Sequence, residues 1–224
     1  MPSDDSRRLN LDFLITLKGF VTLMRDPERT NSVFDIEDGL RHSKAAELAA
    51  EHAKTHPDVA ALFAERYLAP PPDVDALLQL PSDSLGYAYA SYLREAGFDP
   101  EFYRPVDIED DVTYMFMRMR QTHDIWHVVT GFGSDVKGEL GLKAFELAQV
   151  HRTLAGMLLA GGLLRTLLKT PEELDGLLDQ IAIGYRMGAR AKPLLAQKWE
   201  EGWEKSIAEW RSALDVQVME VYVP

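Results

Sequence analysis

The sequence contains no cysteine among its 224 residues. That absence excludes disulfide bonds, zinc sites built from thiolates, and cysteine nucleophiles. Long apolar runs are also missing, since the longest one reaches from Leu154 to Leu164 and ends at Arg165. A helix that crosses a bilayer needs about 20 apolar residues. The sequence therefore predicts no membrane-spanning helix.

Basic residues are scarce as well: 24 Lys and Arg stand against 36 Asp and Glu, which gives a net charge of -12. Nonspecific binding to nucleic acid depends on cationic side chains that meet phosphates, so we expect no nucleic-acid partner. The N-terminal residues Met1 to Asp5 are acidic and polar, unlike a secretory signal or an arginine-rich transit peptide. We therefore expect a cytoplasmic protein.

β-strand signals are nearly absent, and apolar residues recur instead at helical spacing. The expected helices are 9–24, 43–54, 57–67, 84–96, 107–130, 134–160, one that begins at 171, and one from 193 to about 214. Gly161-Gly162 is the candidate break after residue 160, Ala69 to Pro72 is the only candidate linker, and 216–223 is a candidate extended tail. The prediction is an all-α fold in which residues 1–224 form a single-domain array of helices.

The helix expected to end near Thr130 differs from the others in its composition. From Val112 to Met119 it is apolar nearly all round, and such a helix normally lies at the centre of a fold. Polar groups on a buried helix need partners, because an unpaired buried polar group costs free energy. We therefore predict a central buried helix that carries a metal ion.

The candidate ligands begin with His123 and His127, which are four residues apart and lie on one helix face. Asp124 flanks the same surface. Glu139 lies in the next expected helix after a short glycine-containing turn, and an antiparallel neighbour would bring it back beside the histidines. Imidazole and carboxylate ligands suit Zn²⁺, Fe²⁺, Co²⁺ or Mn²⁺ better than Ca²⁺ or Mg²⁺. The sequence predicts one divalent ion at His123, Asp124, His127 and Glu139.

Other interpretations of this pattern stay open. His123 and His127 also fit ordinary half-buried histidines that form hydrogen bonds. The pattern shares pieces with His-Glu-x-x-His proteases, but Asp124 stands where those enzymes have glutamate. Di-iron proteins need two carboxylate-x-x-His motifs, and this sequence has only one. Further along the next helix, Lys143 and Glu146 fit either a second layer around the metal or a solvated surface.

The spacing His-Asp-x-x-His, eleven residues, then Glu resembles the signature of the coenzyme Q (ubiquinone) biosynthesis protein 4 family. Further similarities make the resemblance clearest over residues 75–215. They are Leu80-Pro81, Leu85 to Ala90, Arg118 to Arg120, Gly138 to Leu140 with Lys143, Phe145 and Glu146, and Trp199-Glu200 with Trp203-Glu204 and Arg211. Because it lacks the transit peptide of mitochondrial members, the sequence is similar to a bacterial member.

The resemblance implies an all-helical protein with one divalent metal ion, usually zinc, on His123, Asp124, His127 and Glu139. It also implies a lyase for ubiquinone biosynthesis. This enzyme would remove the carboxyl group at C1 of a polyprenylated 4-hydroxybenzoate-type precursor, with hydroxylation at the same carbon. In such an enzyme Asp124 would be a ligand or proton shuttle, and Arg120 would neutralise substrate charge.

A second function is implied by an older interpretation of the family, in which the protein is a non-catalytic lipid-binding scaffold that organises quinone-biosynthesis enzymes around a structural metal. Both interpretations imply homo-oligomers, contact with an isoprenoid lipid, and peripheral association with the bacterial inner membrane. An open coordination position on the metal would favour the enzyme, whereas a closed one would favour the scaffold.

Overall fold

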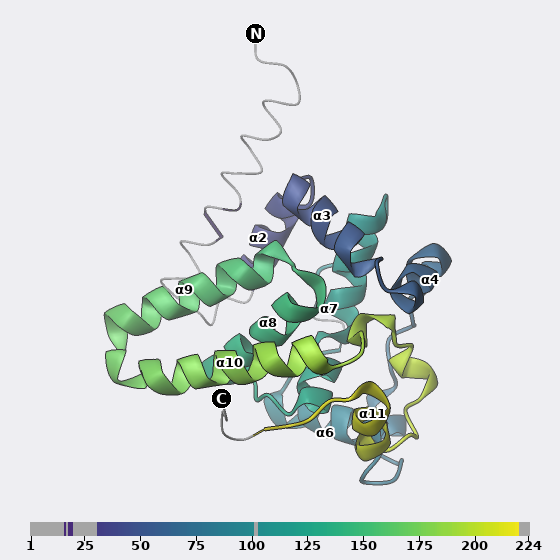
Figure 1. The fold of residues 1–224 in the computed structure, drawn as a ribbon. Helices are drawn as coiled ribbons and strands as arrows, with labels where there is room; N and C mark the ends of the chain where they lie inside the picture. The colour runs from purple at the N-terminus through teal and green to yellow at the C-terminus, as the bar shows by residue number, and fades with distance from the viewer. Residues whose placement is uncertain (1–15, 17, 20–30, 101–102, 220–224) are drawn as a thin grey trace.

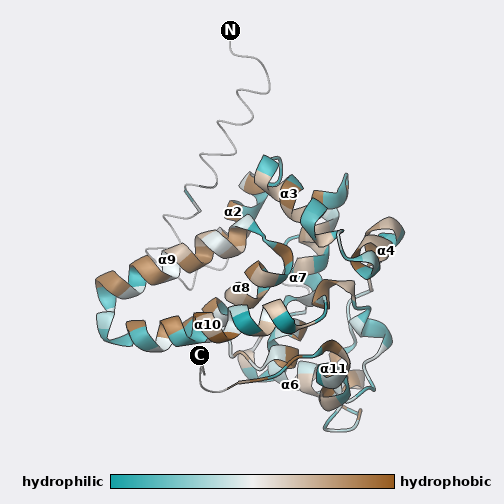
Figure 2. Cartoon of the chain, viewed as in Figure 1, coloured by the Kyte–Doolittle hydropathy of each residue, from teal (hydrophilic) through white to brown (hydrophobic). Residues whose placement is uncertain are grey.

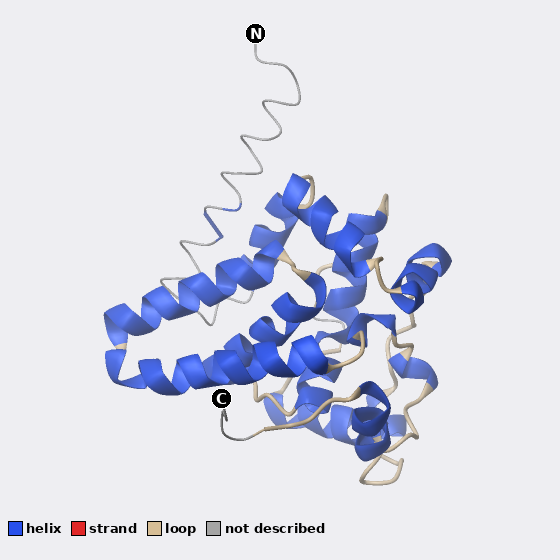
Figure 3. Cartoon of the chain, in the orientation of Figure 1, coloured by secondary structure: helices blue, strands red, loops and turns tan. Residues whose placement is uncertain are grey.

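The computed structural model describes residues 16, 18, 19, 31–100 and 103–219, and these residues form helices and no β-strands (Figure 1; Figure 3). The helices are α2 (Asn31–Leu40), α3 (Lys44–Ala53), α4 (Pro57–Glu65), α5 (Val74–Leu77), α6 (Leu85–Ala96), α7 (Asp111–Thr130), α8 (Val136–Val150), α9 (Thr153–Lys169), α10 (Leu174–Arg190) and α11 (Ile207–Leu214). The all-α prediction is confirmed. The helix expected over 9–24 lies outside the described residues, apart from 16, 18 and 19.

Helix α7 is the central element, as the sequence predicts. It begins at Asp110, whose carboxylate accepts from the backbone N–H of Thr113 in a capping box, and it ends at Gly131 in the left-handed conformation. Buried side chains follow its whole length from Val112 to Thr130. Helices α3, α6, α8 and α11 all pack against it. Among the described residues, none of the helices combines the length and the apolar character that a bilayer crossing needs.

The proline-rich segment Ala69 to Pro72 lies against α7. The Gln121 amide donates to the Ala69 carbonyl at 2.6 Å and accepts from the Ala69 N–H at 3.4 Å. About two turns earlier on the helix, the Tyr114 hydroxyl donates to the carbonyl of Tyr67 at 3.0 Å. The segment is therefore a connector held onto the central helix by side chains of that helix.

The single helix predicted over 134–160 is wrong, because the chain forms two helices there. Helix α8 ends before His151, which adopts a left-handed φ of 56°, and α9 begins two residues later. The turn directs Arg152 inward, where its guanidinium binds the carboxylates of Glu146 and Glu37. We attribute the break to this buried pairing, since an isolated buried charge would be strongly unfavourable.

The expected break at Gly161-Gly162 does not occur, and α9 runs through both glycines. A Cβ atom at position 162 would lie 2.3 Å from Cδ1 of Leu140 on α8. Glycine therefore serves close helix packing here instead of ending the helix.

The final helix is shorter than predicted. Pro193 is followed by two short 3-10 turns, Leu194–Ala196 and Trp199–Glu201, and α11 begins only at Ile207. Ser206 caps it, because its hydroxyl accepts from the Glu209 N–H while the Glu209 carboxylate accepts from the Ser206 N–H. Residues 216–219 have no regular secondary structure, and the rest of the expected extended tail lies outside the described residues.

Helices α8 and α10 pack with their backbones nearly in contact. A Cβ atom at Gly184 on α10 would lie 2.0 Å from the carbonyl oxygen of Gly141 on α8, and one at Gly188 would lie 2.5 Å from the carbonyl oxygen of Phe145. A backbone oxygen cannot rotate away as a side chain can. Since α8 also supplies a candidate metal ligand, this contact fixes the position of that ligand.

Replacement of Gly184 by alanine is expected to lower the free energy of unfolding by about 3 kcal/mol, because the methyl group forces α8 and α10 apart. Urea unfolding followed by circular dichroism measures the change. Gly156 on α9 is the matched control, since a Cβ there meets nothing within 4 Å. Alanine at 156 is expected to be neutral or to stabilise by up to about 1 kcal/mol. Equal stability of the Gly184 variant and the unmodified protein would contradict the packing argument.

Candidate metal centre

Three side chains converge at the C-terminal end of α7 and the start of α8. His127 Nε2 lies 3.1 Å from Oε1 of Glu139, and His123 Nε2 lies 3.6 Å from Oε2 of the same carboxylate. The two Nε2 atoms are 3.3 Å apart. One ligand atom from each residue lies within 4.8 Å of those of the other two. This spacing places all three within reach of a single ion at their centre.

The turn between α7 and α8 brings Glu139 to this place. It is tight, because a Cβ atom at Gly138 would lie 2.1 Å from the Gly133 carbonyl oxygen. Asp135 starts α8 by accepting from the Gly138 N–H at 2.7 Å. Glu139 follows within the first turn of α8 and so faces back to the end of α7.

His127 is oriented as a metal ligand. Its Nδ1 lies 2.9 Å from the Phe132 carbonyl oxygen, and because a carbonyl only accepts, Nδ1 must carry the proton. Metal-binding histidines commonly hold the second ring nitrogen in this way. Its Nε2 faces the Glu139 carboxylate and the Nε2 of His123, and these atoms are all acceptors unless an imidazole carries a second proton. Such a group of acceptors needs a cation between its members, either a proton or a metal ion.

The ionisation of the other two residues also suits a metal. Burial, together with the positive charge of Lys143, lowers the pKa of His123, which favours the neutral imidazole that a metal requires. Burial opposes ionisation of Glu139, but hydrogen bonds with His123 and His127 outweigh it and hold the pKa of this carboxyl well below its usual range. The residues present therefore fit a divalent ion with nitrogen and oxygen ligands.

The cluster is covered on one side only. The His127 side chain is fully buried, whereas the side chains of His123 and Glu139 retain 31% and 38% of their exposure. A tetrahedral ion held by these three residues would keep one position for water or a substrate oxygen, as catalytic zinc sites do.

Asp124 lies outside this cluster, although the sequence analysis expects it as a fourth ligand. It is half-buried. Two tyrosines of α6, Tyr89 and Tyr92, have raised pKa values. Their burial is the main cause, and the negative charge of Asp124 adds to it. The Tyr92 ring in turn stacks on His127 with centroids 5.7 Å apart. Asp124 as a ligand or proton shuttle stays a prediction.

Arg120 does not face the cluster with a free guanidinium. It is buried, and its Nε donates to Glu37, its Nη1 to the Arg104 carbonyl at 2.6 Å, and its Nη2 to Asp38 at 2.9 Å. These partners engage all three guanidinium nitrogens. The arrangement favours a structural role for Arg120 over the expected neutralisation of substrate charge.

Lys143 and Glu146 are buried, which excludes the solvated-surface interpretation: they retain 8% and 1% of their exposure. The Lys143 ammonium donates to Glu146 at 2.9 Å, and the Arg152 guanidinium donates to the other carboxylate oxygen at 2.8 Å. Burial opposes ionisation of Glu146, but the charges of Arg152 and Lys143 lower its pKa to about 2. The sequence does not distinguish the two interpretations, because Arg152 becomes a partner of Glu146 only through the break between α8 and α9.

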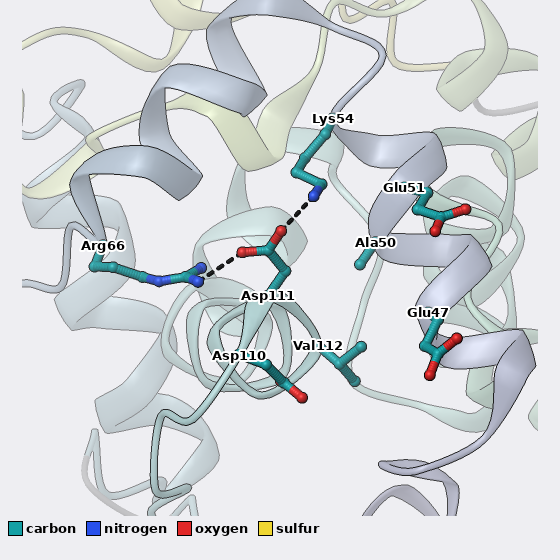
Figure 4. Close-up of a pocket in the computed structure, with 8 residues that line it drawn as sticks. All are labelled: Glu47, Ala50, Glu51, Lys54, Arg66, Asp110, Asp111 and Val112. Carbon is teal, nitrogen blue, oxygen red and sulfur yellow. Dashed lines mark hydrogen bonds and ion pairs between the residues drawn. The ribbon is translucent and has the colours of Figure 1, made fainter.

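A separate pocket of about 360 Å³ lies at the other end of α7 (Figure 4). Lys54 and Arg66 both reach into it and bind the Asp111 carboxylate, the arginine at 2.6 Å. The two cations of the pocket thus share one carboxylate, and its other charged side chains are those of Glu47, Glu51 and Asp110. The pocket opens beside the first turn of α7, whereas His123 and His127 occupy the last turns of this 20-residue helix.

Comparison with known proteins gives consistent results. A family model described as "Coenzyme Q (ubiquinone) biosynthesis protein Coq4" matches residues 13–220. The mitochondrial ubiquinone biosynthesis protein COQ4 of Eremothecium gossypii is 37% identical over 149 residues, which cover 65% of this chain and 45% of that protein. The COQ4 homolog of Aedes aegypti is 30% identical over 152 residues, covering 66% and 54%. The matched segment is thus about half the length of these curated relatives.

A solved structure extends the similarity over nearly the whole chain. A crystal structure from Nostoc punctiforme, provisionally described as a ubiquinone biosynthesis protein, superposes with a TM-score of 0.83 at 38% identity. The match covers 91% of this chain and 97% of that one. Together with the family match, it confirms the resemblance found in the sequence: this chain belongs to the coenzyme Q (ubiquinone) biosynthesis protein Coq4 family.

Proposed function

We propose that the protein is a metal-dependent lyase that removes the carboxyl group at C1 of a polyprenylated 4-hydroxybenzoate-type quinone precursor. The observation that carries the proposal is the three-residue cluster of His123, His127 and Glu139, with Asp124 outside it. With three protein ligands, two of them on partly exposed side chains, a bound ion would keep a coordination position for substrate. A structural site would instead close the coordination sphere with protein ligands.

A bound divalent ion would act as a Lewis acid for the substrate carboxylate. The chain's own residues hold and orient it: the Phe132 carbonyl fixes the His127 ring from one side, and Tyr92 stacks on its face. In the reaction the bond between C1 and the carboxyl carbon breaks and CO₂ leaves. In a simple decarboxylation a proton takes its place. In the oxidative form a hydroxyl group takes its place, with dioxygen and a two-electron donor as co-reactants and water as the second product.

The lipid part of the proposal rests on helix α9. Leu164, Leu167 and Leu168 near its end are exposed, and Arg165 and Lys169 lie between and beside them. In Figure 2 hydrophobic residues recur along α9, which forms with α10 a hairpin that extends away from the rest of the helices. Exposed leucines next to basic side chains suit contact with an isoprenoid chain or a membrane surface.

The purified, zinc-loaded protein is expected to release CO₂ from 3-polyprenyl-4-hydroxybenzoate carried in liposomes, and to do so at least about 10-fold faster than from unprenylated 4-hydroxybenzoate. The reason is that binding energy from the tail positions the head group. Release of ¹⁴CO₂ from carboxyl-labelled substrate measures the rate, and parallel samples with Fe²⁺, Co²⁺ and Mn²⁺ identify the active metal. Product analysis separates the phenol of simple decarboxylation from the hydroquinone of the oxidative reaction. No release with any of these metals, with dioxygen and a reductant present, would favour the scaffold.

A further inference from the structure

A chain of buried charges leads from the metal cluster into the protein. It alternates in sign: Lys143, Glu146, Arg152, Glu37 and Arg120. Each carboxylate is shared by two cations, so these five groups hold three positive and two negative charges. At the far end Arg120 also binds Asp38, a carboxylate that it shares with Arg104 and Arg41.

At the near end the Lys143 ammonium has no such second carboxylate. Within the described part of the chain its one acidic partner is Glu146 at 2.9 Å, and that carboxylate already binds Arg152. An ammonium has three N–H donors, and this one is 10% exposed at its side chain. A buried ammonium with spare donors is costly unless an anion joins it.

Lys143 also lies beside the metal cluster. It is four residues after Glu139 on α8, and residues at this spacing share a helix face. Its charge acts directly on His123, and His123 acts on Glu146 in turn. A divalent ion bound by one carboxylate and two neutral histidines carries one net positive charge. Lys143 therefore adds a second positive group beside the position of the ion.

We infer that Lys143 is the residue that binds the carboxylate of the substrate beside the metal, the role that sequence reasoning gave to Arg120. The inference rests on the proposed function for the identity of the substrate. One carboxylate oxygen accepts from the Lys143 ammonium while Glu146, held by Arg152, fixes the position of the lysine. The carbonyl oxygen of the neutral amide can accept only a weaker hydrogen bond from the same ammonium, because it carries no charge, so the site selects an acid over its amide.

The test compares 3-prenyl-4-hydroxybenzoate with its primary amide by calorimetry, on metal-free and on zinc-loaded protein. Lys143→Met keeps the length of the side chain and removes its charge. We expect it to weaken binding of the acid on the order of 10- to 100-fold, the usual range for a hydrogen bond to a charged group. Binding of the amide should change less than about twofold, a difference too small for a charge-assisted contact. Zinc content should stay at about one ion per chain, since Lys143 is not a ligand.

A purely structural role for Lys143 predicts a different pattern. Lys143→Met alone leaves the Glu146 carboxylate paired with Arg152 only. The double variant Lys143→Met with Glu146→Gln also removes the negative charge of Glu146, so that no carboxylate is left without its second cation. If the lysine only pairs with Glu146, the double variant recovers binding of the acid. If the lysine binds substrate, the double variant stays as weak as the single one. Lys137→Met is the matched control: it changes a lysine of the same helix whose side chain is 44% exposed and pairs with Glu173, and the variant should bind both ligands normally.

The inference is overturned by recovery in the double variant, by equal losses for acid and amide, or by failure of the unmodified protein to bind the acid more tightly than the amide. Its failure and that of the proposed function are distinguishable. CO₂ release that is insensitive to Lys143 substitutions overturns the role of Lys143 and keeps the lyase. If the unmodified protein binds the acid through Lys143 but releases no CO₂, the role of Lys143 is kept and the lyase is overturned.

Discussion

A His127→Ala variant is expected to lose its zinc almost completely, from about one ion per chain to near zero. Loss of one of three ligands removes a metal–nitrogen bond that bulk water replaces only weakly. His127 is the most informative ligand to change, because its Nδ1 is fixed on the Phe132 carbonyl and its Nε2 lies between His123 and Glu139. Elemental analysis after dialysis against a zinc buffer measures the ratio of ion to chain.

Two further variants make this result interpretable. His127 is fully buried, so its replacement also leaves a void. His123→Ala changes a side chain that is 31% exposed, and it should lose zinc equally with less disturbance of the fold. His56→Ala is the matched control: the residue is exposed and makes no side-chain capping bond at the start of α4. Full zinc content in folded His123 and His127 variants would show that the cluster is not a metal site.

The parts of the site that the sequence predicts are local. His123 and His127 share a face because helix geometry fixes residues four apart, and Glu139 returns to them because the turn from Gly131 to Asp135 is too short for any other course. The helix boundaries at Ser84, Gly97 and Gly131 follow from capping preferences for the same reason.

The parts that could not be predicted depend on partners distant in sequence. Arg120 lies close in sequence to the histidines, as a substrate-binding cation would. In the structure its guanidinium instead binds Glu37, which is 83 residues earlier in the chain. The break after α8 contains neither glycine nor proline. His151 adopts the left-handed conformation there, and the ion pair of Arg152 with Glu146 compensates for its unfavourable backbone energy. Such long-range ion pairs leave no periodic pattern in the sequence.

One missed boundary did have a local signal. The residues Ser206 and Glu209 have the spacing of a capping box, and they mark the start of α11. Pro193 suggested an earlier start, because proline suits the first turn of a helix. The buried Trp199 instead lies in a 3-10 turn between the two positions.

Glu139→Gln is expected to reduce CO₂ release from the prenylated substrate at least about 100-fold, equivalent to roughly 3 kcal/mol or more of transition-state stabilisation. The substitution keeps the volume of the side chain but removes the carboxylate charge beside His123 and His127 that would bind the ion. An amide oxygen is a far weaker ligand for a divalent ion than a carboxylate, so zinc content should fall together with the rate. Zinc content and the rate of CO₂ release should fall in parallel, because both depend on the Glu139 carboxylate.

The fold should survive this change, since Glu139 lies in the first turn of α8 and 38% of its side chain is exposed. Circular dichroism and thermal unfolding must accompany the assay, because an unfolded variant would lose activity for a trivial reason. Glu51→Gln, an exposed carboxylate on α3 outside the cluster, is the matched control and should keep the full rate and one zinc ion per chain. A folded, metal-free Glu139→Gln protein that released CO₂ at the full rate would place the reaction at another site and would contradict a catalytic role for the cluster of His123, His127 and Glu139.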